Sequence, residues 1–313
     1  MSVRVLVCGE ALVDLVPVRS AGAPPGSLFA AALGGGPFNV AIALGRLGSA
    51  VGLLSRISTD GFGVRLAQRL VESGVDLALL QRGPEHTTLA VTTLDSAGAA
   101  TYGFYAEGTA DRLVADPGVL PDSVRALSFG TLSLLYEPGA SVYEALLHRA
   151  HADGRLTMLD PNIRPLAITD PTGYRARFAG WLPSVDVLKV SEDDADWLSA
   201  GPGGTELAHW LEAGVGAVLL TRGGDGLSVI TRDFRCDVAA PPTVVADTIG
   251  AGDTVHGATL HWLDRREALD SATVRGWGSG DWEAALRFAV RAAAITVSRQ
   301  GADPPWAREA ASD

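Results

Sequence analysis

The order of apolar and polar positions along the chain predicts strands and helices in alternation. Short apolar runs of this kind are typical of strands buried on both faces of a parallel sheet. They lie at residues 3–9, 51–57, 126–129, 156–159, 185–190, 217–220 and 227–230. Runs with the apolar spacing of helices lie at residues 40–47, 61–73, 141–151, 254–263 and 282–297. The alternation predicts an α/β fold with a parallel sheet.

A β-hairpin interrupts this alternation. Residues 87–94 and 99–105 are β-prone and are joined by a turn sequence at residues 95–98. We interpret the hairpin as a flap over the edge or the active face of the sheet. Phe104 lies among aromatic residues that alternate along it, so one face could close on a ligand, although core packing explains each ring as well. Residues 19–33, rich in Ala, Gly and Pro, are expected to form a loop or an edge element.

Composition places the chain among ordinary globular proteins. Of its 313 residues, 47% are hydrophobic and 19% are charged, which is enough apolar material for a large core. No internal repeat or low-complexity linker divides the sequence, so we expect a single domain of residues 1–313. The formal net charge of -11 argues against a nucleic-acid partner, because binding a phosphate backbone needs clustered cations.

The cysteines and the single lysine limit the cellular compartment and the kind of phosphate-binding site that the chain can have. Cys8 and Cys236 are isolated, which indicates a reducing compartment rather than a disulfide scaffold. The sequence has no signal-peptide pattern and no apolar stretch of membrane-spanning length, so a cytoplasmic protein without a membrane partner is expected. Lys189 is the only lysine, and the absence of any Gly-Lys pair excludes the phosphate-binding loop that ends in Gly-Lys-Ser/Thr.

Residues 247–257 have the character of an anion site. They read Asp-Thr-Ile-Gly-Ala-Gly-Asp-Thr-Val-His-Gly and lead from a β-like run at residues 244–245 into a helix. Small residues at 250–252 let a ligand approach the backbone, and the first N–H groups of a helix attract anions. The same helix end should keep Asp253 ionised, so it would act as a base through its position rather than through a raised pKa. A first-turn acid beside a glycine turn explains these residues equally well.

Polar groups also follow the earlier strands. Asp14 stands beyond the first strand, where ligands of open α/β sheets collect; it could accept hydrogen bonds from hydroxyls or be a solvated loop acid. Residues 34–39 read Gly-Gly-Gly-Pro-Phe-Asn and precede a helix. A dinucleotide fingerprint fails there, because its third glycine position is Asn39 and no strand directly precedes the glycines. Such a cluster better suits a small polar ligand.

Three later loops carry further candidates. Residues 160–165 read Asp-Pro-Asn-Ile-Arg-Pro, where Arg164 could steady anionic oxygens or form a surface salt bridge. The helix that follows Ser191 has acids in its first turn, which explains helix capping and could also orient a metal-bound water. Residues 221–226 read Thr-Arg-Gly-Gly-Asp-Gly, which suits a nucleotide or a hairpin turn.

Together, these stretches resemble the ribokinase-like sugar kinases, most closely the fructokinase branch. Residues 35–41 with Gly48, and residues 247–254, carry the resemblance most specifically, and it extends over nearly the whole chain. Supporting segments lie at residues 9–14, 160–164, 221–223 and 299–302. The resemblance implies a three-layer α/β/α fold with a central, mostly parallel sheet and a small β lid built from residues 11–33 and 87–110.

The activity that the resemblance implies is ATP-dependent transfer of the γ-phosphoryl group to a hydroxyl of a small sugar, with fructose as the first expectation. Asp253 would be the general base, Gly250, Ala251 and Gly252 the anion hole, and Arg164 would lie near the transferred phosphate or the substrate. The sugar would be held by Asp14, Gly35, Gly36 and Asn39, to which we add Phe104 of the flap. ATP would be bound by Asn162, Thr221, Gly223 and Gly226, to which we add Lys189 and Gly252.

The resemblance also implies metal ions. The family uses Mg²⁺, and many members bind K⁺ through oxygens near the positions of Asp247, Ile249, Thr296 and Gly301. Many relatives carry Asn-x-x-Glu where this chain has Ser191 to Asp194, which leaves Asp194 as the candidate for a contact to Mg²⁺ through water.

Other activities stay open at this stage. They are ribokinase or 2-keto-3-deoxygluconate kinase activity, and a sugar or nucleotide sensor of the same fold that has lost catalysis. Many fructokinases and ketodeoxygluconate kinases carry an arginine in the lid at the position where this chain has Ala106. An acid sugar would need a cation there, so Ala106 weakens the ketodeoxygluconate alternative. A homodimer formed through the lid hairpins is expected, because their exposed edge needs a cover.

Overall fold

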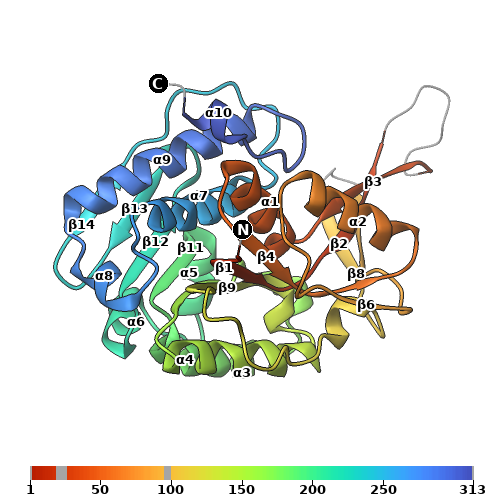
Figure 1. Ribbon diagram of the computed structural model, residues 1–313, viewed down its shortest axis with the longest axis horizontal. Coiled ribbons are helices and arrows are strands. Elements are labelled where there is room, and N and C mark those ends of the chain that lie inside the picture. Colours follow the sequence, from red (N-terminus) through yellow and green to blue (C-terminus); the bar gives the residue numbers. More distant parts are fainter. Residues whose placement is uncertain (1, 19–26, 95–99, 312–313) are drawn as a thin grey trace.

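The structure, a computed structural model, describes residues 2–18, 27–94 and 100–311 (Figure 1). The strands of its main sheet are, in order, β14 (Arg235–Val238), β13 (Leu227–Ile230), β12 (Ala217–Thr221), β11 (Val187–Ser191), β10 (Leu156–Asp160), β9 (Ala126–Gly130), β1 (Val5–Cys8) and β4 (Val51–Leu54). Neighbouring strands from β4 to β12 are parallel, and β13 and β14 continue the sheet antiparallel. The predicted, mostly parallel sheet is confirmed.

Helices on both faces of this sheet complete the three layers (Figure 1). One side carries α1 (Gly36–Leu47), α2 (Gly61–Glu72), α7 (Ala251–Arg265), α8 (Ser271–Gly276), α9 (Ser279–Val297) and α10 (Ala307–Ala310). The other carries α3 (Gly139–Ala152), α4 (Pro171–Trp181), α5 (Glu192–Ser199) and α6 (Leu207–Ala213). Side chains of β1 alternate between the two apolar clusters, with Val5 and Val7 on one face and Leu6 and Cys8 on the other. This double burial explains the unbroken apolar run of β1.

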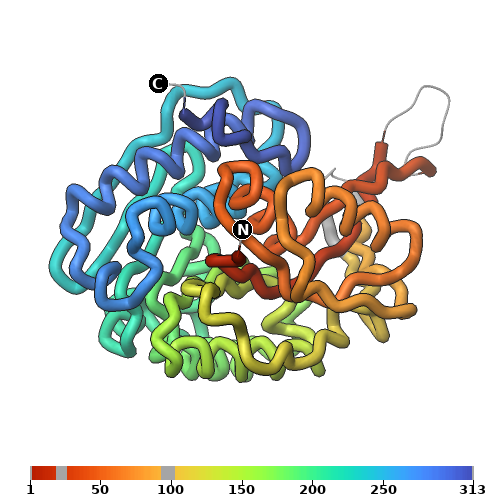
Figure 2. Tube along the Cα trace, in the orientation of Figure 1, coloured from red at the N-terminus to blue at the C-terminus, as the bar shows by residue number. Residues whose placement is uncertain are grey.

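A smaller sheet stands at one side of the molecule (Figure 2). Its strands are, in order, β3 (Phe29–Gly34), β2 (Leu12–Pro17), β7 (Leu89–Leu94) and β8 (Ala100–Tyr105). Strands β7 and β8 pair antiparallel, as the hairpin prediction requires, and residues 95–99 of its turn lie outside the described residues. Strand β3 lies at the edge of this sheet, which confirms the edge element at residues 29–33; residues 19–26 lie outside the description. That this sheet acts as a lid stays a prediction.

Three expectations about local structure were wrong. Residues 51–57 form two strands, because the chain leaves the main sheet after β4 and pairs as β5 (Arg56–Ser58) in parallel with β6 (Gln81–Gly83). Val244 and Val245 form no strand and are 88% and 59% exposed. A strand, β3, does precede the glycines at residues 34–36. Because β3 belongs to the small sheet, the parallel β–α–β unit of a dinucleotide site is still not formed there.

Among the described residues, no helix combines the length and apolar character needed to cross a bilayer.

Candidate active site

A cavity of about 440 Å³ lies where the small sheet faces the carboxyl ends of the parallel strands and the start of α7. Most of the predicted site residues line it: Asp14, Gly35, Gly36, Asn39, Phe104, Asn162, Arg164, Lys189, Ile249, Gly250, Gly252, Asp253 and Gly301. Ala251, Asp194, Asp247, Thr221, Gly223, Gly226 and Thr296 are not among its lining residues. The fold thus gathers side chains from both ends of the sequence around one space.

Two helix starts that line the cavity are joined by a hydrogen bond between side chains. Asn39 lies in the first turn of α1 and Asp253 in the first turn of α7. The Asn39 Nδ2 group donates to Asp253 Oδ2 at 2.8 Å. Burial raises the pKa of Asp253, opposed by the Asn39 hydrogen bond and by the charges of Lys189 and Arg164. The expectation that Asp253 would act without a raised pKa was therefore wrong, because desolvation outweighs the helix end.

The turn before α7 presents backbone donors to the cavity. Gly250 is the N-cap in the left-handed conformation, with φ 77°, and the first intrahelical bond runs from Thr254 N to Gly250 O at 2.8 Å. The N–H groups of Gly252 and Asp253 therefore have no intrahelical acceptor. A Cβ atom on Gly250 would lie 2.6 Å from Ala302 Cβ, so the turn is held close to the segment after α9. Such a helix end can hold a phosphate or a developing anion.

The only lysine of the chain forms a buried ion pair at the base of the cavity. Lys189 Nζ donates to Asp160 Oδ2 at 2.6 Å, and the two side chains are 4% and 5% exposed. Burial raises the pKa of Asp160 to about 6, against the opposing effect of Lys189. Burial by itself would lower the pKa of Lys189, but the charge and hydrogen bond of Asp160 together with the charges of Asp194 and Asp253 raise it overall. A Cβ on Gly252 would lie 2.9 Å from Lys189 Nζ, so this glycine lets the cation reach the helix start.

Asp14 and Arg164 both line the cavity and carry opposite charges. Asp14 lies on β2, and Gly34 on the neighbouring strand leaves the space for its carboxylate, because a Cβ there would lie 2.2 Å from Asp14 Oδ2. Burial raises the pKa of Asp14 to about 6, with Arg164 lowering it and Asp253 raising it. Arg164 donates to Asn162 Oδ1 at 2.7 Å. A carboxylate and a guanidinium are thus presented to one ligand.

Sequence reasoning missed one acid of the cavity, Glu10. It is 2% exposed, accepts hydrogen bonds from the Thr131 hydroxyl and from the Ser133 N–H, and lines the cavity. Burial raises the pKa of Glu10 to about 7. The signal was present, because Glu10 follows the first strand four positions before Asp14. Its partner Thr131 is remote in sequence, so the network could not be read from spacing.

The four positions expected near K⁺ are only partly joined. The Asp247 carboxylate accepts hydrogen bonds from Ile249 N at 3.0 Å and from Gly301 N at 2.9 Å. The Thr296 hydroxyl is instead paired with Thr254 Oγ1 at 2.9 Å inside the protein. Asp247 thus ties the segment before α7 to the segment after α9.

The remaining candidates lie away from the cavity. Thr221 ends β12, and Gly223 and Gly226 belong to the turn that follows, both with positive φ. The carboxylate of Asp194 is occupied, because it accepts hydrogen bonds from the Ile163 N–H at 2.7 Å and from the Ser191 hydroxyl at 2.7 Å. The capping of α5 expected from Ser191 is confirmed.

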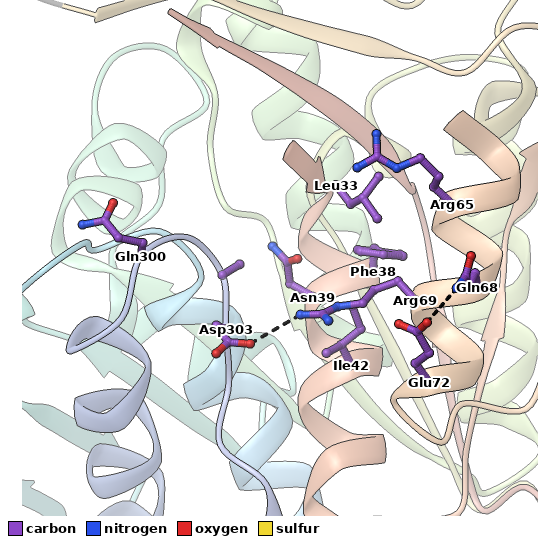
Figure 3. A pocket seen from close by; sticks show the side chains of 11 residues that line it. Leu33, Phe38, Asn39, Ile42, Arg65, Gln68, Arg69, Glu72, Gln300 and Asp303 are labelled. Atoms are coloured by element: carbon purple, nitrogen blue, oxygen red, sulfur yellow. Dashed lines mark hydrogen bonds and ion pairs between the residues drawn. The ribbon is translucent and has the colours of Figure 1, made fainter. Parts of the chain in front are cut away.

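A second cavity, of about 470 Å³, adjoins the first and shares Leu33, Asn39 and Ala302 with it (Figure 3). Arg69 of α2 and Asp303 face one another across it at 3.4 Å. This second cavity is lined by α1, α2 and the segment after α9.

Comparison with known proteins decides the family. Residues 3–308 match the model of the pfkB family of carbohydrate kinases. The chain belongs to this family. It is 40% identical over 273 residues to a fructokinase from Rhizobium leguminosarum bv. trifolii, covering 86% of this chain and 82% of that relative.

Solved structures of family members agree with this fold. A fructokinase with bound ATP from Xylella fastidiosa matches with a TM-score of 0.88 and 27% identity, covering 98% of this chain and 96% of that one. A double-mutant fructokinase from Vibrio cholerae O395, in a form with fructose, ADP and potassium ion, matches with a TM-score of 0.79 and 25% identity, covering 96% and 94%. The ribokinase-like fold is confirmed, and the protein is an ATP-dependent carbohydrate kinase.

Proposed function

We propose that this kinase phosphorylates fructose, with Asp253 as the general base. The observation that carries the proposal is the Asn39–Asp253 pair at the start of α7, inside a cavity that also holds Asp14 and Arg164. The relatives named fructokinase support the choice of sugar. Asp14, Asn39 and the backbone at Gly35 and Gly36 would hold the sugar hydroxyls, and Phe104 would close over the ring.

In the proposed reaction, Asp253 takes the proton of one sugar hydroxyl, and that oxygen forms a bond to the γ-phosphorus of ATP. The bond between the γ-phosphorus and the bridging oxygen breaks, and ADP leaves. The N–H groups at the start of α7 stabilise the negative charge on the transferred group, with Arg164 beside them. Positioning and charge stabilisation are the main demands of phosphoryl transfer, so a phosphate-loop lysine is not required.

The nucleotide is assigned to the turn after β12 and to the base of the cavity. Thr221, Gly223 and Gly226 would lie along ATP, and Asn162 and Lys189 would face its phosphates. Lys189 already neutralises Asp160, so its role would be to keep that buried carboxylate from repelling the phosphates.

Mg²⁺ would be held chiefly by the phosphates of ATP. Among the described residues no group of three or more His, Cys, Asp or Glu side chains could hold a metal ion. When bound, the ion would neutralise charge on the β- and γ-phosphates. Asp194 would reach it only through water, since its oxygens already accept hydrogen bonds. For K⁺ the segments tied by Asp247 supply backbone carbonyls near Ile249 and Gly301, and the potassium form of the Vibrio cholerae relative supports this assignment.

We also propose that the small sheet acts as a lid and joins two copies in a homodimer. Its edges are β3 and β8, and Phe29 and Tyr105 on them are 43% and 68% exposed. Light scattering coupled to size exclusion at micromolar concentration should give twice the monomer mass; a monomer mass would overturn the dimer. A cytoplasmic location is proposed from the free thiols, Cys8 and Cys236.

The test of the function is ADP release across a panel of fructose, ribose, ketodeoxygluconate and a nucleoside. Fructose should give the highest kcat/KM. Preference for ketodeoxygluconate would contradict the proposal directly, since Ala106, which stands where that acid would need a cation, is buried and uncharged. Tight sugar binding in calorimetry without ADP release would indicate a sensor instead.

A further inference from the structure

A third cavity, of about 420 Å³, lies at the opposite end of α7 from Asp253. The last turns of α7 supply one wall, α9 supplies the second, and the short helix α10 borders the third side. Basic and aromatic side chains form most of its lining: His261, Trp262, Arg265, Arg266, Phe288 and Arg291. No role in the phosphoryl transfer described above falls on any of them.

The arginines of this cavity lack partners of opposite charge. Among the described residues, Arg265, Arg266 and Arg291 form no salt bridge, and no carboxylate is among the lining residues of the cavity. The neighbouring acid, Asp264, is already paired with Arg4 at 2.7 Å. In a chain with a net charge of -11, three exposed arginines around one hollow, without ion pairs to other described residues, are a local concentration of positive charge. Part of it complements the negative end of the α7 dipole, but Arg291 belongs to another helix.

A buried histidine contributes a donor to the same hollow. His261 is 6% exposed, and its one hydrogen bond within the described part of the chain joins Nδ1 to Ser49 Oγ at 2.8 Å. In the tautomer in which the Ser49 hydroxyl donates to Nδ1, the neutral ring carries its proton on Nε2. Burial, together with the charge of Arg265, lowers the pKa of His261 to about 4, so the ring is neutral at pH 7. Nε2 is then a donor for which the described residues supply no acceptor.

Stacked rings make the wall firm and apolar. The rings of His261 and Phe288 are stacked with centroids 5.6 Å apart, and Trp262 packs on Phe288 at 5.3 Å. The guanidinium of Arg266 lies over Trp262 at 5.0 Å. Planar guanidinium groups donate in pairs to the oxygens of a phosphate, and the rings suit a ligand with a less polar body.

We propose that this cavity binds a phosphate-bearing small molecule, with the phosphate held between the guanidinium groups of Arg265 and Arg291 and the Nε2 of His261. The volume of about 420 Å³ lies within the range of small-molecule sites and admits inorganic phosphate, a hexose phosphate or a nucleotide. The ligand would join α7 to α9. These two helices also meet at the active site, where α7 starts beside Gly250 and the segment after α9 packs on it through Ala302.

The test compares three probes on the full chain by isothermal titration calorimetry: inorganic phosphate, ADP and a hexose 6-phosphate. In the double variant R265Q/R291Q, the affinity of the phosphate-bearing probe for this cavity should fall by at least about tenfold, because charge-assisted contacts to the phosphate are removed. The matched control is Arg287→Gln, one turn before Arg291 on α9 and ion-paired with Glu283 outside the cavity. It should bind all three probes as the wild type does.

The active site also attracts phosphates, so the location is tested separately. Crystals soaked in tungstate, a phosphate analogue, should show an anomalous peak between Arg265 and Arg291 that is absent in R265Q/R291Q. The probe with the largest loss in the variant identifies the source of the phosphate. Equal binding of all probes by wild type and R265Q/R291Q, with no peak at this place, overturns the proposal. Neither measurement depends on turnover, so its outcome is independent of the kinase assignment.

Discussion

Replacing Asp253 with asparagine tests the assigned base with almost no change of shape. The introduced amide would keep an oxygen to accept the hydrogen bond that Asn39 Nδ2 now makes at 2.8 Å, so the sugar side of the cavity should be preserved. What is lost is a group that can take the hydroxyl proton. General-base catalysis is worth about 10² to 10⁴ in rate, or about 3 to 5 kcal/mol in the barrier. We therefore expect kcat to fall by about two to four orders of magnitude, while KM for the sugar stays near the wild-type value.

The pH dependence of kcat gives a second readout of the same residue. Asp253 is active when ionised, and burial raises its pKa, so the acid limb should lie above that of an exposed aspartate. The folded protein binds the Asp253 proton more tightly than the unfolded chain does, because its pKa is raised in the fold. The contribution of Asp253 to stability is therefore lost as the pH rises through this pKa and the carboxyl ionises. Asp253→Asn should therefore melt no lower than the wild type near neutral pH. Coupled ADP-release kinetics and thermal melts measure both; a well-folded variant with kcat within about threefold of the wild type would refute the base assignment.

Three further changes probe the surroundings of the site. Lys189→Met leaves Asp160 buried without its partner and should destabilise the fold by about 3–5 kcal/mol, measured by urea unfolding. Gly250→Ala should cost about 1–2 kcal/mol from the left-handed backbone alone and more from the contact with Ala302, and kcat should fall as the helix start moves. Asp14→Asn should raise KM for the sugar about tenfold or more with a smaller change in kcat, because a charge-assisted hydrogen bond is weakened.

Each of these changes has its own control. Adding D160N to K189M should recover most of the lost stability, and failure to do so would remove the ion pair from the explanation. Gly280→Ala, at an open position with no atom within 4 Å of the added methyl group, should leave activity unchanged. For D14N, an unchanged KM for the sugar would mean that Asp14 does not bind it.

Much of the fold could be predicted, because short local runs of apolar residues mark most strands of the main sheet. Residues 5–8 are all apolar because β1 packs on both faces of the sheet. The break between β4 and β5 was missed because the predicted β-prone run continues past Leu54 to Ile57, although Ser55 and Arg56 interrupt its apolar character. The pairing of β5 with β6 in a separate sheet depends on a partner strand that lies about 25 residues further along the chain.

The sequence predicted which residues form the site better than it predicted their pKa values. Asp14, Asn39 and Asp253 were found from their places at strand and helix ends, and all three line one cavity. Their pKa values could not be foreseen, because desolvation depends on the small sheet and on charges brought from distant segments. Glu10 escaped notice for the same reason, since its partner Thr131 lies far along the chain.

The most direct test of the account is the rate of ADP release with fructose, measured side by side for the wild type and Asp253→Asn. The wild type should release ADP only when both ATP and fructose are present, and the folded variant should be at least about a hundredfold slower. Wild-type protein that releases no ADP with any sugar of the panel, or a variant as active as the wild type, would contradict it.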